Sequence, residues 1–421
     1  MQPTSPLRTP GSLAPDVLAS GRHMKILHII SGLGVGGAEM LLLRLIRESN
    51  GDGTEHRVIV LSGHVALCGQ VQSAGAQVKI LGMRSGLPQP GFIRQIVKQI
   101  IEFEPDVVQT WMYHADLLGG IAAYLARSAS PFRSPAKRPA LVWAVHHTDF
   151  PTLLAAPKLC IVARACAMVS KAVPDLIVCC AEAARASHAH AGYNASRMTV
   201  IHNGFDAHTY RPQPEARLRL RESLGLASNA LIVGIVGRYH LLKDYPNFVA
   251  SAARVCHSNP QCQFVMAGKG VEPDNVELVN MLRDAGLTGA CHLLGPRDDI
   301  DGLIPGFDVL CLSSRSEGFP TVVGEAMACG VPCVATDVGD TRALIGNTGL
   351  VVAREDPKAL ATAMLSLLRL PVDERKHLGA LARERIVSTF SIQSTWQNYL
   401  HAYTTLLSRR VELQKPALSD L

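Results

Sequence analysis

Residues 313–336 read S-S-R-S-E-G-F-P-T-V-V-G-E-A-M-A-C-G-V-P-C-V-A-T, and this stretch decides the fold. One apolar run ends at Leu312, a polar turn follows, and another apolar run begins at Val331. Between them, Pro320 suits the first turn of a helix and Gly330 suits the position just after its end. The stretch is therefore predicted to form a strand, a loop, a helix and a strand, the unit of a parallel sheet covered by helices.

The start of this predicted helix has the features of an anion site. The backbone N–H groups of Gly318, Phe319 and Thr321 would be donors that have no partner within the helix. The helix dipole also favours negative charge at that end. A diphosphate is the ligand that these donors predict.

Two acids flank the same site. Glu317 lies in the loop before the helix, and Glu325 lies eight residues further on. Because their charge opposes a phosphate, a functional role requires that each carboxylate accept hydrogen bonds from hydroxyl groups, for instance those of a sugar and a ribose. The alternative, from spacing alone, is a solvated loop acid and an ordinary acid on a helix surface.

The alternation of strand, turn and helix recurs along the whole chain. Short apolar runs separated by helix-length segments occupy 26–30, 58–61, 78–81, 107–108 and 141–145, and then 231–236, 264–267, 308–312 and 331–335. This pattern predicts an α/β protein of two doubly wound domains in series, with the joint near His202-Asn203-Gly204. Ligands bind outside the carboxyl ends of such strands, so two facing sheets would form a cleft.

Charged and glycine-rich segments follow several predicted strands. Arg238 and Lys243 lie just after the run 231–236 and could neutralise a leaving diphosphate, although cations beside turns are commonly solvated. Gly36 and Gly37 belong to G-L-G-V-G-G-A-E, which superficially matches a dinucleotide fingerprint. No acidic residue ends a strand about twenty residues further on, so a backbone nest for a phosphate or sugar is the better interpretation.

Two further motifs each have a structural and a functional interpretation. His146 and His147 follow the run 141–145 and could reach a cleft, or could be ordinary core or surface histidines. The segment Asp298-Asp299-Ile300-Asp301 contains a D-x-D pattern that could hold a metal-bound diphosphate. Because it precedes an apolar helix, helix capping and dipole pairing explain it more simply, and no metal site is predicted.

The composition excludes several classes of protein. A chain of 421 residues with 48% hydrophobic and 18% charged residues is globular, and it is long enough for two or three domains of about 150 residues. The 11 cysteines form no C-x-x-C pair, which predicts reduced core thiols in a cytoplasmic protein and no zinc site. No apolar run reaches the ~18 residues of a membrane span.

Charge is unevenly divided between the two halves. Up to Asn203 there are 19 Lys and Arg against 12 Asp and Glu, and beyond it 22 against 23. A basic first half predicts an anionic partner, with a solvated surface as the alternative. Nucleic acid is excluded because no long basic run or aromatic-interleaved patch is present. An anionic bilayer or a phosphorylated small molecule fits better.

Taken together, these residues resemble a known family. The chain from Met24 to about Leu407 resembles the retaining nucleotide-sugar glycosyltransferases called group 1 or family four, which have the GT-B fold. The motif with Glu317 and Glu325 carries the resemblance, with support from G-G-A-E, G-R-x4-K-D and H-N-G-F-D at 202–206. W-M-Y-H-A-D at 111–116 and D-V-G-D at 337–340 are similar to the bacterial surface-polysaccharide branch. Lys269 and Asp340 depart from the usual pattern.

Residues 1–23 are rich in Pro, Ser and Gly and are predicted to be a disordered extension, or the product of a start placed too far upstream. For the rest, the resemblance implies a domain plan, with 24–203 an N-terminal Rossmann-like acceptor domain and 204–390 a C-terminal Rossmann-like donor domain. Residues 391–410 would form a helix that crosses back to the first domain, and 411–421 a tail. Acceptor pockets would be built from first-domain loops around 88–91, 113–116 and 148–151.

The resemblance also implies roles for single residues. Glu317 would contact the hydroxyls of the donor sugar and Glu325 the ribose. Arg238 and Lys243 would hold the diphosphate, and His147 would face the sugar. The amides of Gly318, Phe319 and Thr321 would lie beside the phosphates, and Gly37 would close over the phosphates from the other domain. Gly268 and Arg297 would lie near the base. His146 is the alternative to His147.

The implied reaction is transfer with retained anomeric configuration, by attack on the same face, without a metal or other cofactor. The donor would be a UDP-sugar or GDP-sugar, and the acceptor a glycan or lipid-linked glycan at the cytoplasmic face of a membrane. Two alternatives remain open from sequence: a nucleotide-sugar epimerase of the same architecture, and a non-catalytic, membrane-docked partner subunit.

Overall fold

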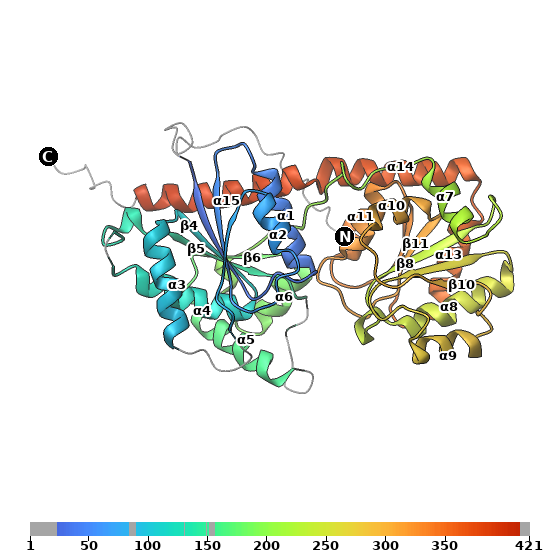
Figure 1. The fold of residues 1–421 in the computed structure, drawn as a ribbon, viewed down its shortest axis with the longest axis horizontal. Coiled ribbons are helices and arrows are strands. Elements are labelled where there is room, and N and C mark those ends of the chain that lie inside the picture. Colours follow the sequence, from blue (N-terminus) through green and yellow to red (C-terminus); the bar gives the residue numbers. More distant parts are fainter. Residues whose placement is uncertain (1–22, 84–89, 130, 149, 151–155, 413–421) are drawn as a thin grey trace, which may run out of the picture.

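The computed structural model describes residues 23–83, 90–129, 131–148, 150 and 156–412. The described chain forms two parallel sheets, each covered by helices on both sides (Figure 1). Of the predicted segments, residues 1–22 of the extension, residues 88–89, 149 and 151 of the acceptor loops, and residues 413–421 of the tail lie outside the described residues. The predicted tail begins two residues too early, because a helix continues to Glu412.

The first sheet has seven parallel strands in the order β3-β2-β1-β4-β5-β6-β7. Its strands are β1 (Lys25–Ile30), β2 (Glu55–Val60), β3 (Gln77–Ile80), β4 (Val107–Trp111), β5 (Ala140–Val145), β6 (Leu176–Cys179) and β7 (Met198–Val200). Its helices are α1 (Gly37–Glu48), α2 (Cys68–Ser73), α3 (Pro90–Phe103), α4 (Tyr113–Ala126), α5 (Pro157–Val169) and α6 (Glu182–His190).

The second sheet has six parallel strands in the order β10-β9-β8-β11-β12-β13. Its strands are β8 (Ile232–Val236), β9 (Gln263–Ala267), β10 (Cys291–Leu293), β11 (Val309–Leu312), β12 (Cys333–Thr336) and β13 (Leu350–Val352). Its helices are α7 (Ala216–Ser223), α8 (Tyr245–Ser258), α9 (Val276–Asp284), α10 (Ile300–Leu303), α11 (Thr321–Ala328), α12 (Thr341–Ile345), α13 (Pro357–Leu368) and α14 (Val372–Thr389).

Both strand orders reverse beside the strand that opens the domain, between β1 and β4 and between β8 and β11. Such a reversal leaves a crevice at the carboxyl ends of the two strands, where open α/β sheets bind ligands. The loops after β1, β8 and β11 are the segments in which the sequence placed Gly37, Arg238 and Glu317. The topology therefore puts the predicted site residues at the ligand-binding ends of both sheets.

The helix after β11 confirms, to within one residue, the helix predicted between Pro320 and Gly330. Pro320 is the residue before α11, and the helix ends just before Cys329 and Gly330, whose φ of +73° suits glycine. The expected strand 331–335 is wrong at its start, because β12 begins only at Cys333. Four short strands, β6, β7, β10 and β13, were not predicted, since runs of three or four residues give little periodicity.

The chain crosses between the domains twice, and the two crossings run side by side. Phe205 and Ser391 form a parallel bridge, in which Phe205 N–H donates to the Phe390 carbonyl at 2.9 Å. A Cβ on Gly204 would lie 2.7 Å from Ile392 Cα, so only glycine lets the crossings approach this closely. The joint expected at 202–204 thus coincides with the first crossing.

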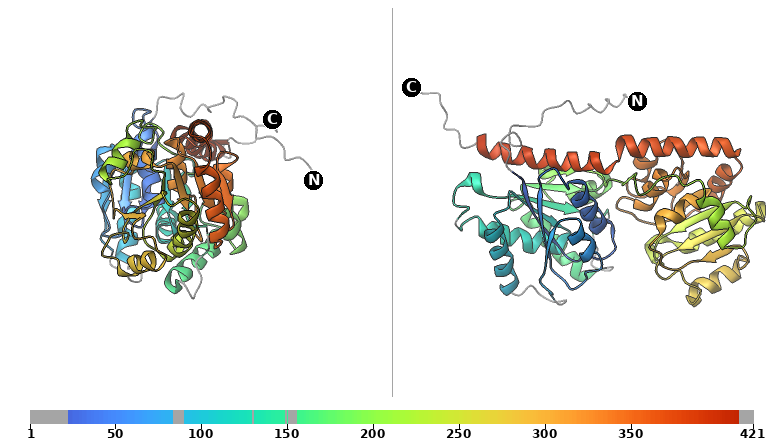
Figure 2. Two further views of the ribbon diagram at one scale, coloured as in Figure 1. Left: turned by 90° about the vertical axis from the view of Figure 1, so that its right-hand side faces the viewer. Right: turned by 45° about the horizontal axis from the view of Figure 1, so that its top comes forward.

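Beyond the second crossing, α15 (Ile392–Glu412) returns over the first domain while α14 stays on the second (Figure 2). Its buried aromatic side chains include Trp396, whose Nε1 donates to Asp52 Oδ2 at 2.8 Å, and Tyr403, whose hydroxyl donates to Gln109 Oε1 at 3.1 Å. The implied crossover helix is therefore anchored on the first sheet by both apolar burial and hydrogen bonds.

A chain of hydrogen bonds lies buried under α15. Trp111 Nε1 can only donate, and it meets His28 Nδ1 at 3.2 Å, so His28 Nε2 must carry the hydrogen that reaches His56 Nδ1 at 3.0 Å. His56 Nε2 then donates to Ser49 Oγ at 2.7 Å, and Ser49 donates to the carbonyl of Ile46. Both imidazoles are therefore neutral. Burial lowers the pKa of His28 well below its usual value and that of His56 to about 4.

These neutral histidines predict a loss of stability in mild acid. The unfolded chain binds protons below about pH 6.5, whereas native His56 stays neutral down to about pH 4. Between these values each such histidine should lower the free energy of unfolding by about 1.4 kcal/mol per pH unit. Urea unfolding measured across this range should show a smaller pH slope for His56→Gln than for wild type. The same slope in both proteins would contradict the argument, and His64→Gln, at an exposed site, is the matched control.

Candidate active site

The N-terminus of α11 presents a row of free backbone donors. No described residue accepts a hydrogen bond from the amides of Gly318, Phe319 or Thr321, whereas Val323 N–H already bonds the Pro320 carbonyl. The helix has eight residues, so its dipole adds positive potential at this end. Such a row of donors at a helix N-terminus suits an anion, and the diphosphate site stays a prediction.

Glu317 lies directly before these donors and is paired with Lys243. Lys243 Nζ lies 2.6 Å from Glu317 Oε1, and Ser314 Oγ donates to the same oxygen at 2.5 Å. Ser313 Oγ bonds the Lys243 carbonyl at 2.7 Å, which fixes the lysine segment to the loop after β11. The structure thus brings together two predicted site residues that are 74 positions apart.

Arg238 and the loop containing Gly268 lie side by side at the ends of β8 and β9. The Arg238 side chain is exposed, and no described residue forms a hydrogen bond or ion pair with it. Gly268 has a φ of +145°, and a Cβ there would lie 2.1 Å from the Gly237 carbonyl oxygen, so the close approach requires glycine. Arg297 instead donates to both carboxylate oxygens of Asp299, the first aspartate of the D-x-D pattern. The expected capping is wrong at Asp299, whose side chain makes no capping hydrogen bond to α10, while Asp301 lies in the first turn of that helix.

Glu325 does not lie beside Glu317 in a shared acidic cluster. Its Oε1 is 2.5 Å from Nη2 of Arg44, which belongs to α1 of the first domain. Gly37 begins the same helix α1, with open space where its Cβ would stand. Each of the two acids therefore has a cation of its own, one from each domain.

Phe319 contributes its ring to the junction between the domains. The ring is buried and stacks on His202 at 5.1 Å, with Phe205 and Phe390 at about 6 Å. Only the backbone amide of Phe319 is then left for a donor substrate. A Cβ on Gly324 would lie 2.0 Å from the Phe205 ring, so this helix position must be glycine for the junction to pack.

The two histidines after β5 have different environments. His147 is exposed, and its ring stacks on Tyr113 at 5.9 Å. His146 stacks on Trp111 at 5.3 Å, and both of its ring nitrogens are buried without a described partner. Burial lowers the pKa of His146 to about 3 and keeps it neutral. His147 is therefore the histidine that a substrate in the cleft can reach.

The first domain touches the Glu317 loop at the end of β5. Thr148 Oγ1 donates to the Glu317 carbonyl oxygen. The His146 carbonyl oxygen would be 2.8 Å from a Cβ on Gly318, so any side chain there would force the loops apart. Gly318 thus has a steric requirement in addition to its free amide.

Asp340 forms a second polar link between the domains. Its carboxylate accepts hydrogen bonds from the amides of Glu182 and Ala183 at the start of α6, at 2.7 and 3.1 Å, and lies 3.0 Å from His202 Nε2. Burial alone would raise the pKa of Asp340, but the hydrogen bonds from His202 and the two amides lower it below its usual value. The aspartate that departs from the resembled pattern therefore caps a helix of the other domain.

Sequence reasoning missed Arg44 and the role of Asp340. Arg44 interrupts the apolar run M-L-L-L-R-L-I, and a charge inside such a run is a signal that it has a buried partner. Nothing in the sequence identifies that partner, because Glu325 is 281 residues away.

Solved structures of similar fold define the class. The chain matches Anabaena Alr3699/HepE in complex with UDP with a TM-score of 0.77 and 23% identity, covering 91% of this chain and 100% of that one. It matches sucrose-phosphate synthase from Thermosynechococcus elongatus with a TM-score of 0.72 and 18% identity, covering 91% and 100%. Two Rossmann-like domains arranged as in these proteins make this a GT-B glycosyltransferase fold.

Sequence families agree with the fold. Residues 35–209 match the model for Glycosyltransferase Family 4, and residues 230–370 match the model for Glycosyl transferases group 1. EpsF of Bacillus subtilis is 27% identical over 326 residues, which are 74% of this chain and 79% of that protein. The D-inositol 3-phosphate glycosyltransferase of Mycobacterium tuberculosis is 31% identical over 221 residues, 50% of this chain and 44% of that protein. The chain belongs to the group 1 and family 4 glycosyltransferases.

The contact of Asp340 with α6 predicts a measurable loss of stability. Asp340→Ala removes a helix cap and the partner of His202, and should lower the free energy of unfolding by about 1–2 kcal/mol. Asp337→Ala, three residues earlier in an exposed pair with Arg342, should change it by less than about 0.5 kcal/mol. Urea unfolding of both variants tests this. If Asp340→Ala lowered the free energy of unfolding no more than Asp337→Ala does, the contact of Asp340 with α6 would not stabilise the protein.

Proposed function

We propose that the protein is a retaining, metal-independent glycosyltransferase that uses a nucleotide-sugar donor, with UDP-sugars favoured over GDP-sugars. The observation that carries this proposal is the Lys243–Glu317 pair at the start of α11, beside the exposed Arg238. Complexes of the similar Anabaena protein with UDP and UDP-glucose support the donor class. The donor nucleotide is a substrate, and no other cofactor is proposed.

The charge of each group at the site suggests its role in the proposed transfer. Free amides of α11, Arg238 and Lys243 would stabilise the negative charge that develops on the leaving diphosphate. The Glu317 carboxylate would accept hydrogen bonds from sugar hydroxyls. His147 would face the sugar, and attack on the face that the diphosphate leaves would retain the anomeric configuration.

We also propose a glycan or lipid-linked acceptor of surface polysaccharide synthesis at the cytoplasmic face of a membrane. No described helix is long and apolar enough to span a bilayer. The outer surface of α5 carries exposed Ile161 and Met168 beside Lys158 and Arg164. Exposed Lys171 follows in the next turn, and segment 157–171 contains no acid. Apolar and cationic side chains on one helix face suit an anionic bilayer surface.

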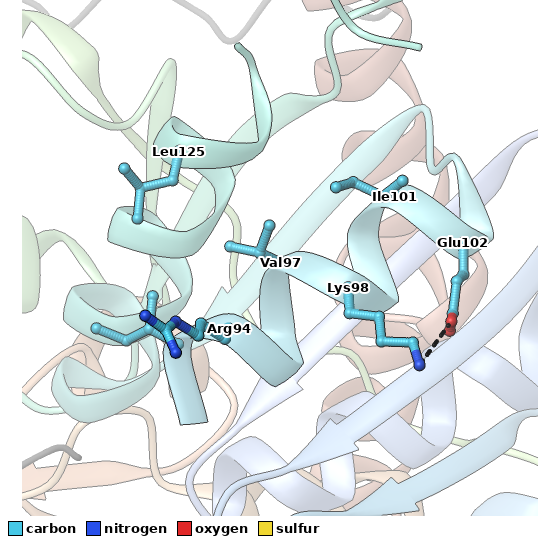
Figure 3. Close-up of a pocket in the computed structure, with 7 residues that line it drawn as sticks. Arg94, Val97, Lys98, Ile101, Glu102 and Leu125 are labelled. Atoms are coloured by element: carbon cyan, nitrogen blue, oxygen red, sulfur yellow. Dashed lines mark ion pairs between the residues drawn. The ribbon is translucent and has the colours of Figure 1, made fainter. Parts of the chain in front are cut away.

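The neighbouring helices α3 and α4 extend this surface. Between them lies a hollow lined by apolar Ile93, Val97, Ile101 and Leu125, with Arg94, Lys98 and Glu102 around it (Figure 3). Leu125 is exposed at the end of α4. An apolar hollow with cations beside it fits the same partner as α5.

A nucleotide-release assay tests the transferase proposal. Purified protein is given UDP-, GDP- and ADP-sugars with and without EDTA, and slow hydrolysis of one donor, unchanged by EDTA, is expected. Glu317→Ala should lower this rate about 100-fold, because charged hydrogen bonds are lost. Glu215→Ala, at an exposed surface position, should leave the rate unchanged.

The same assay separates the alternatives. An epimerase would interconvert the sugar and would show no acceptor-dependent transfer. A non-catalytic subunit would show neither hydrolysis nor transfer, and absence of nucleotide binding by ligand-observed NMR would favour it. Hydrolysis that EDTA abolishes would contradict the metal-independent mechanism.

Co-sedimentation with vesicles tests the membrane proposal. Binding should increase when phosphatidylglycerol is added to phosphatidylcholine. Arg164→Gln with Lys171→Gln should weaken this binding about 30-fold, because each cation near the surface contributes about 1 kcal/mol. Arg219→Gln with Arg283→Gln, on exposed faces of the second domain, is the charge-matched control. Binding that is insensitive to anionic lipid would overturn the proposal.

A further inference from the structure

The buried ion pair between Arg44 and Glu325 joins the two domains. Arg44 Nη2 lies 2.5 Å from Glu325 Oε1, and the side chains are only 7% and 12% exposed. Arg44 Nη1 also donates to the carbonyl of Gly204 at 3.3 Å, and its guanidinium lies 5.8 Å from the centre of the Tyr210 ring. Arg44 is thus held by three groups on the second domain and the first crossing.

The pair connects α11, which begins at the proposed diphosphate site, with α1 of the first domain. Arg44 lies in α1, which starts at Gly37, and Glu325 lies in α11, which starts at Thr321. Figure 1 shows α1 and α11 on the two sides of the junction between the domains. A fixed link between these helices sets the distance between their N-termini, and therefore the space available to a ligand between them.

Stability alone does not explain this pair. Burying two charges costs free energy that their attraction barely returns, and apolar side chains of similar size would pack here as well. An arginine does something that an apolar side chain cannot, because its planar fork fixes the orientation of the carboxylate that it bonds.

One oxygen of Glu325 is left for another partner. Oε1 accepts from Arg44, while no described residue donates a hydrogen bond to Oε2. A carboxylate with one fixed and one free oxygen can accept a hydrogen bond from a ligand hydroxyl. Because α11 begins at the proposed diphosphate site, the hydroxyl nearest in a nucleoside diphosphate belongs to its ribose.

We propose that Arg44 is a positioning residue that orients Glu325 toward the ribose hydroxyls of the donor, and that it does so only when the two domains are closed. The inference rests on the proposed nucleotide-sugar donor. Recognition of the ribose then depends on both domains: Glu325 comes from the second, and the group that orients it comes from the first. An open molecule would bind the diphosphate without discriminating the sugar of the nucleoside.

Binding of ribose and deoxyribose nucleotides to the full chain tests the proposal. UDP, GDP and ADP are titrated by calorimetry, and the one that binds is compared with its 2′-deoxy and 3′-deoxy counterparts. Wild type should prefer the ribonucleotide by about 10- to 100-fold over at least one deoxy form, the range for a hydrogen bond to a charged group. In Arg44→Met the preference should fall below about threefold, with affinity for the deoxy form unchanged.

Matched variants separate positioning from a general structural effect. Arg47→Met changes an exposed arginine of the same helix, whose side chain bonds only the exposed Gln70 among the described residues, and should keep the preference. Glu325→Gln should lose it, and combining Glu325→Gln with Arg44→Met should have no additional effect. Arg44→Lys keeps the charge without the planar fork, is expected to fold, and should give an intermediate preference.

Each outcome decides one of the two proposals. An unchanged preference in folded Arg44→Met or Arg44→Lys overturns the role of Arg44. Wild type that binds a nucleoside diphosphate without preferring ribose overturns the inference and leaves the donor proposal standing. Wild type that binds none of the three nucleotides, by calorimetry or NMR, overturns the proposed function, and the inference with it.

Discussion

The paired crossings at Phe205 and Ser391 are the constraint on which the cleft depends. They are joined by backbone hydrogen bonds, and the Phe205 ring packs against the surface of α11 at Gly324. Backbone bonds of this kind tolerate little displacement, so the crossings fix where α11 stands relative to the first sheet. Every proposed donor contact of the second domain is attached to that helix or to the strands beside it.

The two acids near the start of α11 are each paired with a cation. Two carboxylates near a phosphate site would repel the ligand if they were unpaired. Lys243 pairs with Glu317 from within the same domain, and Arg44 pairs with Glu325 from the other. The carboxylates can therefore accept hydrogen bonds from hydroxyls, while Arg238 and the free amides at the start of α11 remain available to an anion.

The sequence could predict those parts of the site that follow from local rules. Pro320 and Gly330 mark the ends of α11, and parallel strands bring the loop of Arg238 beside that of Glu317. It could not predict that Arg44 meets Glu325 or that Asp340 caps α6, because both contacts depend on how one domain sits on the other. For the histidines, sequence allowed either residue, and only the buried ring nitrogens of His146 separate them.

Some residues of the motif E-G-F-P-T-V-V-G-E can bind a ligand and others pack at the junction between the domains, and the sequence alone does not tell the two sets apart. Glu317 and Glu325 face cations and can bind hydroxyls, and the amide of Gly318 is free. Phe319 and Gly324, in contrast, pack against His202 and Phe205 of H-N-G-F-D. Small and aromatic positions of one motif thus interlock with those of the other at the crossings. Such packing ties the loop before α11 to the junction between the two domains.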